Sequence, residues 1–395
     1  MPSTSAATAR RLDSLTGIRA LAAFAVFTHH THSAIISTSG FGRLSTQGSS
    51  GVAFFFVLSG FVLTWSSRPE DTATSFYRRR IARIAPLYLL AWWGGVALNV
   101  VTGESKLVNQ LPALIGLQAW IPSDEIHFAG NAVLWSLSCE AFFYLAFPLV
   151  IDRLRALSNR AAGGLLAAVL AAAIGWPLLL HPATASGVRY WLMYLFPPAR
   201  FLEFLAGILL ALLVSRGAVG RIPLRPAIGL ALGAYLVAGW APMYLQPVAL
   251  MLLPWVLVIV AAAQHDLAGG RPAPAWLVRL GVWSFAFYLF HQLIIKEMAF
   301  AWLPGSTAIR AVCSLLLLAV AVILAGLLAE QVERPLERRL RGRQPRPRAS
   351  HRGTEPHPEL VSKREPVSKR EPVSEREPAD HTWQVPELAA APTSR

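Results

Sequence analysis

The chain has few cysteines and few acidic residues. The first shortage limits the disulfide and metal sites it can form, and the second gives it a positive net charge. Only Cys139 and Cys313 occur, each within an apolar segment, so the sequence supports neither a disulfide framework nor a cysteine-ligated metal site. Aspartate and glutamate together number 22 against 36 lysines and arginines, which gives a formal net charge of +14. A cleavable signal peptide is not evident either, because the first apolar run contains histidines and lacks a small-residue cleavage site. We expect that run to remain as a membrane span.

Apolar runs, by contrast, recur along almost the whole chain. Hydrophobic residues make up 54% of the 395 residues, and the mean hydropathy is +0.46. This composition predicts an all-α, polytopic membrane helical bundle rather than a soluble globule. We expect about ten transmembrane helices. Their approximate ranges are 16–37, 49–67, 83–102, 133–151, 162–180, 196–215, 226–244, 248–264, 280–302 and 308–330.

One apolar run is too short to cross a bilayer. It extends from Leu111 to Ile121 and is bounded by Pro112 and Pro122, which favours a re-entrant or interfacial segment. Topology supports this choice. If the run does not span, every strongly basic short loop falls on one side of the membrane, as the positive-inside rule requires. We therefore expect both termini to be cytoplasmic and residues 123–131 to face outside.

The basic residues cluster in the short loops between apolar runs and in the C-terminal region. This distribution indicates membrane topology rather than nucleic-acid binding, and we expect no nucleic-acid partner. We predict two parts, a transmembrane domain at 1–340 and a disordered, basic, proline-rich cytoplasmic tail at 341–395. The tail contains a hexapeptide repeated three times between Val361 and Pro378 and has few apolar residues to bury. A weak contact with phospholipids is an alternative to a purely solvated tail.

Two titratable residues in the first predicted span point to chemistry. Arg19 and His30 are eleven residues apart, which places them within roughly 20° of one helical face and about 16 Å apart along the axis. His29 points about 80° away from that face. Because charged side chains are costly inside a bilayer, a fixed cation and a base on one face favour a functional site over packing.

Other intramembrane polar residues lie at a similar predicted depth. Counting from the cytoplasmic ends, His30 lies about 21 Å deep, Glu140 about 20 Å and His291 about 18 Å. A histidine or glutamate at such a depth can also serve only to bond a neighbouring helix or to neutralise an arginine. For Arg200 and Glu203, three residues apart, we favour that structural pairing.

A cluster of arginines opens the third predicted span. Arg78 and Arg79 are explained by membrane anchoring. Arg80 and Arg83 lie three residues apart on one face, so a phosphate-bearing ligand is a reasonable second interpretation. Together with Arg19 they would form a cationic mouth on the cytoplasmic side, below the level of His30.

Seven short sequence blocks occur in order along the chain. They are Leu12 to Arg19 with His30, Gly51 to Phe61, Arg80 to Tyr88, Trp135 to Tyr144, Arg200 to Gly207, Tyr288 to His291, and Val332 to Pro335. With these blocks the chain resembles, from Leu12 to about Pro335, the acyltransferase family 3 membrane proteins, which include bacterial polysaccharide O-acetyltransferases and macrolide acyltransferases.

The resemblance implies an O-acyltransferase that moves an acyl group, acetyl or short branched, from acyl-CoA to a hydroxyl. The acceptor would be a carbohydrate or a glycosylated secondary metabolite such as a macrolide antibiotic. A cell-envelope or exopolysaccharide O-acetyltransferase is one alternative. A proton-coupled transporter or flippase is an alternative of another class, because intramembrane arginine, histidine and glutamate also serve transport. Acyl-CoA is expected as a co-substrate, with no metal and no tightly bound cofactor.

The expected site combines these residues. His30 would act as general base on the acceptor hydroxyl, and Glu140 would orient His30 or balance its charge. Arg19, Arg80 and Arg83 would hold the CoA phosphates, because planar guanidinium donors suit phosphoryl oxygens. The residues predicted to line the acceptor pocket are His291, Tyr288 and Trp135.

Overall fold

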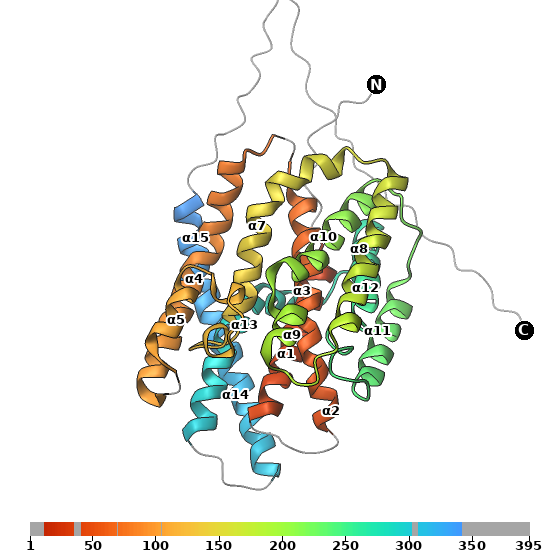
Figure 1. The fold of residues 1–395 in the computed structure, drawn as a ribbon. Coiled ribbons are helices and arrows are strands. Elements are labelled where there is room, and N and C mark those ends of the chain that lie inside the picture. Colours follow the sequence, from red (N-terminus) through yellow and green to blue (C-terminus); the bar gives the residue numbers. More distant parts are fainter. Residues whose placement is uncertain (1–11, 35–40, 69, 104, 302–306, 342–395) are drawn as a thin grey trace, which may run out of the picture. The chain divides into compact units, whose positions relative to one another are not determined.

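The computed structural model describes residues 12–34, 41–68, 70–103, 105–301 and 307–341. The chain divides after Gln344 into two units, and all described residues belong to the first. Apart from Arg341, the predicted tail at 341–395 lies outside the described residues. Every secondary-structure element in the described ranges is a helix, as the hydropathy pattern predicts (Figure 1).

Each of the ten predicted spans coincides with a helix. The ten helices are α1 (Asp13–Ala34), α3 (Ser50–Ser66), α4 (Ala73–Thr102), α7 (Leu134–Arg155), α8 (Asn159–Leu180), α10 (Pro197–Ser215), α11 (Leu224–Ala238), α12 (Leu252–Leu267), α13 (Ala275–Ala301) and α14 (Thr307–Leu328).

Within the described part of the chain, seven continuous helical stretches are long and apolar enough to cross a membrane. They contain α3, α4, α7, α8, α10, α13 and α14, and the stretches of α3, α10 and α14 include neighbouring short helices: Leu44–Ser66, Gly187–Ser215 and Ile309–Leu340. Helices α11 and α12 have only 15 and 16 residues, and α1 carries Asp13, Arg19 and three histidines that lower its hydropathy. The multi-pass, all-helical character is therefore supported, whereas the number of about ten spans stays a prediction.

Short elements connect the long helices. They are α2 (Phe41–Thr46), η1 (Gln47–Ser49), α5 (Leu107–Leu114), η2 (Gln118–Trp120), α6 (Asp124–His127), α9 (Gly187–Tyr190), η3 (Trp191–Leu195), η4 (Ala329–Glu333) and α15 (Arg334–Arg341). The run from Leu111 to Ile121 is divided between α5, a turn and η2. Gly116 makes that turn with a φ of 72°, which glycine adopts without strain. Neither piece is long enough to span a bilayer.

Small residues allow the central helices to approach closely. A Cβ added at Gly60 of α3 would overlap the carbonyl oxygen of Phe204 on α10, and one at Gly207 would overlap that of Val57. On α13, a Cβ at Gly281 would overlap the carbonyl oxygen of Thr16 on α1. Glycine at such positions lets helix backbones pack in contact. Figure 1 shows α4, α5 and α14 on one side of α1, and α8, α11 and α12 on the other.

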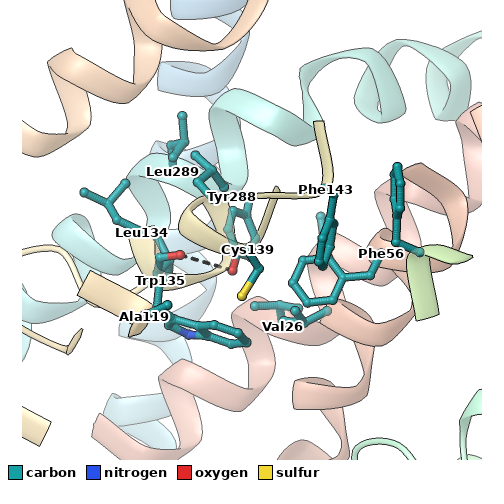
Figure 2. Packing of buried hydrophobic residues seen from close by; sticks show 14 of the residues in the cluster. Val26, Phe56, Ala119, Leu134, Trp135, Cys139, Phe143, Tyr288 and Leu289 are labelled. Atoms are coloured by element: carbon teal, nitrogen blue, oxygen red, sulfur yellow. Dashed lines mark hydrogen bonds between the residues drawn. The ribbon is translucent and has the colours of Figure 1, made fainter. Parts of the chain in front are cut away.

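An aromatic cluster fills the space between α3, α7 and α10. The ring of Phe56 lies 5.0 Å from that of Phe143 and 6.3 Å from that of Trp135, centroid to centroid. Figure 2 shows the rings of Phe56 and Phe143 side by side. Phe143 also stacks on Phe204 at 4.9 Å. These buried contacts fix α7, and with it Glu140, against the rest of the bundle.

Candidate active site

Two histidines from distant parts of the sequence meet where α1 packs on α13. Nδ1 of His30 lies 2.8 Å from Nε2 of His291, and the two rings stack with centroids 5.0 Å apart. The side chain of His291 is fully buried. Its other ring nitrogen, Nδ1, lies 2.8 Å from the carbonyl oxygen of Tyr288 and 3.1 Å from that of Phe287. Both histidines belong to the predicted site, and the structure joins them directly.

The hydrogen bonds determine which nitrogen of each ring carries the proton. A carbonyl oxygen only accepts, so Nδ1 of His291 must be the donor to Tyr288. In a neutral imidazole the other nitrogen then accepts, which makes Nε2 of His291 the acceptor for Nδ1–H of His30. Nε2 is left as the basic nitrogen of His30. The pair therefore gives His30 the tautomer that a general base requires.

Glu140 bonds to a tyrosine on its own helix. The hydroxyl of Tyr144 donates to Oε2 of Glu140 at 3.0 Å. His30 bonds to His291, and the expected role of Glu140 in orienting His30 or balancing its charge stays a prediction. Tyr144 was not predicted as a site residue, although its i+4 spacing from Glu140 on α7 is a signal that could have revealed it.

The three predicted phosphate-binding arginines gather around Glu140. Its carboxylate interacts electrostatically with Arg19, Arg83 and Arg80. Arg19 and Arg83 also interact with Glu333, which comes from η4 and is 7% exposed. Glu333 lies in the block from Val332 to Pro335 that carries the family resemblance, but the sequence predicts no role for it. The arginines, Glu140 and Glu333 together are called the cationic cluster below.

A small cavity of about 70 Å³ connects the cationic cluster with the residues beside His291. Arg19, Glu140 and Tyr288 all line it. The hydroxyl of Tyr288 shares a hydrogen bond with Oγ of Ser136, another lining residue, at 2.7 Å. Tyr288 also packs against His291, with ring centroids 5.8 Å apart. The cavity therefore extends from Arg19 and Glu140 of the cationic cluster to Tyr288, the residue that packs against His291.

Trp135, the third predicted acceptor-binding residue, packs in the aromatic cluster. Its ring lies 6.3 Å from that of Phe56 and 5.1 Å from that of Tyr194. Figure 2 shows Trp135 between Ala119 and Cys139. Phe56 lines the small cavity, so Trp135 supports the cavity wall through this ring.

Arg200 and Glu203 form the buried pair that the sequence favoured. They are 2% and 1% exposed, and Nη2 of Arg200 lies 3.0 Å from Oε2 of Glu203. The guanidinium also lies 5.2 Å and 5.0 Å from the ring centroids of Phe56 and Tyr194. Cation–π contacts of this kind stabilise a buried arginine, so the pair supports the aromatic cluster.

Within the described ranges, no group of three or more histidine, cysteine, aspartate or glutamate side chains is arranged to hold a metal ion.

Comparison with known proteins identifies the family. Residues 12–329 match the acyltransferase domain of acyltransferase family 3. The chain is 38% identical to acyltransferase MdmB of Streptomyces mycarofaciens over 383 residues, which cover 89% of this chain and 98% of the relative. It is 28% identical to the exopolysaccharide production protein ExoZ of Rhizobium meliloti over 324 residues, covering 76% and 93% of the two chains.

A more distant relative is the O-acetyltransferase OatA of Staphylococcus aureus, with 23% identity over 364 residues that cover 84% of this chain and 57% of OatA. No solved structure matches the chain. The match to the family covers most of the chain, including the histidine pair and all three arginines of the cationic cluster. The protein belongs to acyltransferase family 3 and is a membrane acyltransferase.

Proposed function

We propose that the protein transfers an acyl group from acyl-CoA to a hydroxyl of a carbohydrate or of a glycosylated secondary metabolite such as a macrolide. The single observation that carries the reaction chemistry is the His30–His291 hydrogen bond, because it leaves a basic nitrogen on a membrane-embedded histidine. The higher identity to MdmB than to ExoZ is the reason for placing a polysaccharide acceptor second.

In the proposed reaction, Nε2 of His30 accepts the proton of the acceptor hydroxyl. The hydroxyl oxygen attacks the thioester carbonyl carbon, and an ester bond forms as the carbon–sulfur bond breaks. The departing CoA thiolate takes the proton from His30, which restores the neutral imidazole. His291 keeps Nδ1 of His30 as the donor nitrogen throughout, so it acts as a positioning residue.

The cationic cluster would bind the donor. Arg19, Arg80 and Arg83 present planar guanidinium groups to the CoA phosphates, and binding a phosphate offsets the repulsion among these like charges. Glu140, held by Tyr144, would keep the arginines in place when no phosphate is bound. We assign Glu140 this positioning role in place of the expected contact with His30.

The proposed orientation has both termini in the cytoplasm. The start of α1, with Arg19, would then face the side on which acyl-CoA is made, and His30 would lie about 16 Å deeper in the bilayer. The small cavity between the two levels, which Tyr288 and Glu140 line, would be the passage for the thioester.

The test is a transfer assay with purified, reconstituted protein. Release of free CoA thiol is measured with acyl-CoA and with candidate macrolide or polysaccharide acceptors. His30→Ala should reduce turnover on the order of 100-fold or more, because it removes the general base. His29→Ala should cost far less and is a matched control, since the same substitution is made one residue away on another face of α1.

Two outcomes would contradict the proposal. Equal turnover of His30→Ala and the unmodified protein would exclude His30 as the base. Movement of the acceptor across the vesicle membrane without thiol release would indicate the transporter or flippase alternative. Retained binding of acyl-CoA by His30→Ala is expected, because the phosphates are assigned to the cationic cluster at the other end of α1.

A further inference from the structure

A larger cavity, which the proposed function does not yet use, lies between α4, α5 and α7. Its volume is about 570 Å³. The walls are almost entirely apolar, with Ile84 and Ala85 from α4, Leu114 at the end of α5, and Leu137 and Ala141 from α7. This volume is within the range of small-molecule sites. We call this cavity the α4–α7 groove.

Two of the tyrosines that line the α4–α7 groove join its helices by hydrogen bonds. The hydroxyl of Tyr77 donates to the carbonyl oxygen of Leu145 at 3.1 Å, which joins α4 to α7. Eleven residues further along α4, the hydroxyl of Tyr88 donates to the carbonyl oxygen of Ala113, which joins α4 to α5. On a helix these two tyrosines are about 16 Å apart. The two hydrogen bonds therefore hold α5 and α7 against α4 at two levels of the groove.

Charge is present at only one end of the groove. Arg80, a lining residue, lies three residues from Tyr77 and belongs to the cationic cluster. The far end, near Leu114 and Tyr88, is apolar apart from the tyrosine hydroxyl. A cation at one end and apolar walls beyond it suit an amphipathic anion with a hydrocarbon tail.

The groove also adjoins the small cavity of the active site. Leu137 lines both cavities, so its side chain is the partition between them. Tyr144 lines the groove and donates a hydrogen bond to Glu140, which lines the small cavity. An acyl chain would thus enter the groove beside Leu137, from a thioester held in the small cavity.

We propose that the α4–α7 groove binds the acyl chain of the acyl-CoA donor and that the enzyme uses chains longer than acetyl. This inference rests on the proposed function. A membrane lipid would also find apolar walls, because the rim residues Ile81, Ile115 and Leu145 are 63%, 71% and 61% exposed. The donor is favoured, because the groove shares Leu137 with the active-site cavity through which the thioester would pass.

The test compares donors of increasing chain length, from acetyl-CoA to octanoyl-CoA, with one acceptor. The unmodified enzyme should use at least one longer donor about 10-fold better than acetyl-CoA in kcat/KM, since added methylenes fill the groove. Ala141→Leu narrows the groove from an exposed wall position. It should lower kcat/KM for that longer donor about 10-fold and leave acetyl transfer within about twofold.

Ala172→Leu is the matched control, because Ala172 is an exposed alanine on α8, away from the groove. It should leave the chain-length profile unchanged. An unchanged profile in Ala141→Leu, together with normal acetyl transfer, would overturn the groove assignment while leaving the proposed function intact. Absence of acyl-CoA-dependent transfer by the unmodified enzyme would instead overturn the proposed function.

A second measurement needs no variant. A photoactivatable acyl-CoA with a diazirine at the end of its chain is added to the unmodified enzyme, and labelled peptides are identified by mass spectrometry. Labelling within residues 77–88 or 137–145, competed by unlabelled acyl-CoA, is expected. Labelling confined to other helices, or labelling of these peptides that excess acyl-CoA does not reduce, would overturn the proposal.

Discussion

Replacing His291 tests whether this residue orients His30 or contacts the acceptor. His291→Phe keeps a flat ring where the native imidazole stacks on Phe287 at 5.6 Å with an interplanar angle of 9°. It removes the nitrogen that accepts from Nδ1 of His30 at 2.8 Å. His291→Gln keeps a carbonyl oxygen that can accept this hydrogen bond but cannot titrate.

The expected loss follows from the role of the hydrogen bond. General-base catalysis contributes about 10²- to 10⁴-fold, and it depends on the base presenting its unprotonated nitrogen to the hydroxyl. In His291→Phe the ring of His30 can rotate and exchange tautomers, so kcat should fall about 100-fold. In His291→Gln we expect kcat within about 10-fold of the unmodified enzyme, because the acceptor for Nδ1–H is retained.

The assay is thiol release under saturating acyl-CoA with the acceptor concentration varied. A positioning role lowers kcat and leaves KM for the acceptor nearly unchanged. The double variant His30→Ala with His291→Phe should be no slower than His30→Ala alone, because both changes disable one base. A raised acceptor KM with unchanged kcat, or equal losses in the glutamine and phenylalanine variants, would refute the reasoning and restore His291 as an acceptor-binding residue.

Two further predictions concern topology and the tail. Ser123→Cys should react with a membrane-impermeant thiol reagent from the outside, and labelling from the cytoplasmic side alone would contradict the proposed orientation. Truncation after Ser350 should leave acyl transfer largely intact, because the sequence beyond it has little apolar surface to bury, and loss of turnover in a normally inserted truncation would show that the repeats contribute.

The positions of the helices along the chain could be predicted because the length of an apolar run depends only on neighbouring residues in the sequence. Residues 133–151 and 196–215 were predicted as spans, and the structure places α7 at Leu134–Arg155 and α10 at Pro197–Ser215. The number of spans could not be predicted in the same way. Helix α12 is apolar but short, and its residues Val258 and Ile259 are buried within the bundle. Hydropathy cannot distinguish such a core helix from a membrane span.

The site was predictable only where it depends on spacing along one helix. Arg19 and His30 lie on one face of α1 because they are eleven residues apart on a helix with about 3.6 residues per turn. The spacing can be read from the sequence alone. Counting residues also gives the depth of Glu140 and His291 in the membrane. Depth alone does not tell which helices, and so which side chains, are neighbours. Glu140 was therefore assigned to His30 on depth alone, although its carboxylate bonds with Tyr144 one turn away on the same helix.

The partner of His30 depends on how α1 and α13 pack, which no local pattern encodes. The two histidines are 261 residues apart in sequence. Their contact follows from the backbone approach at Gly281, where any side chain would overlap the carbonyl oxygen of Thr16. Because Gly281 and Thr16 lie ten and fourteen residues before His291 and His30, a shift between the helices at that point would change the distance between the imidazoles. The tautomer of the proposed base is thus set by close helix packing near the opposite end of α1.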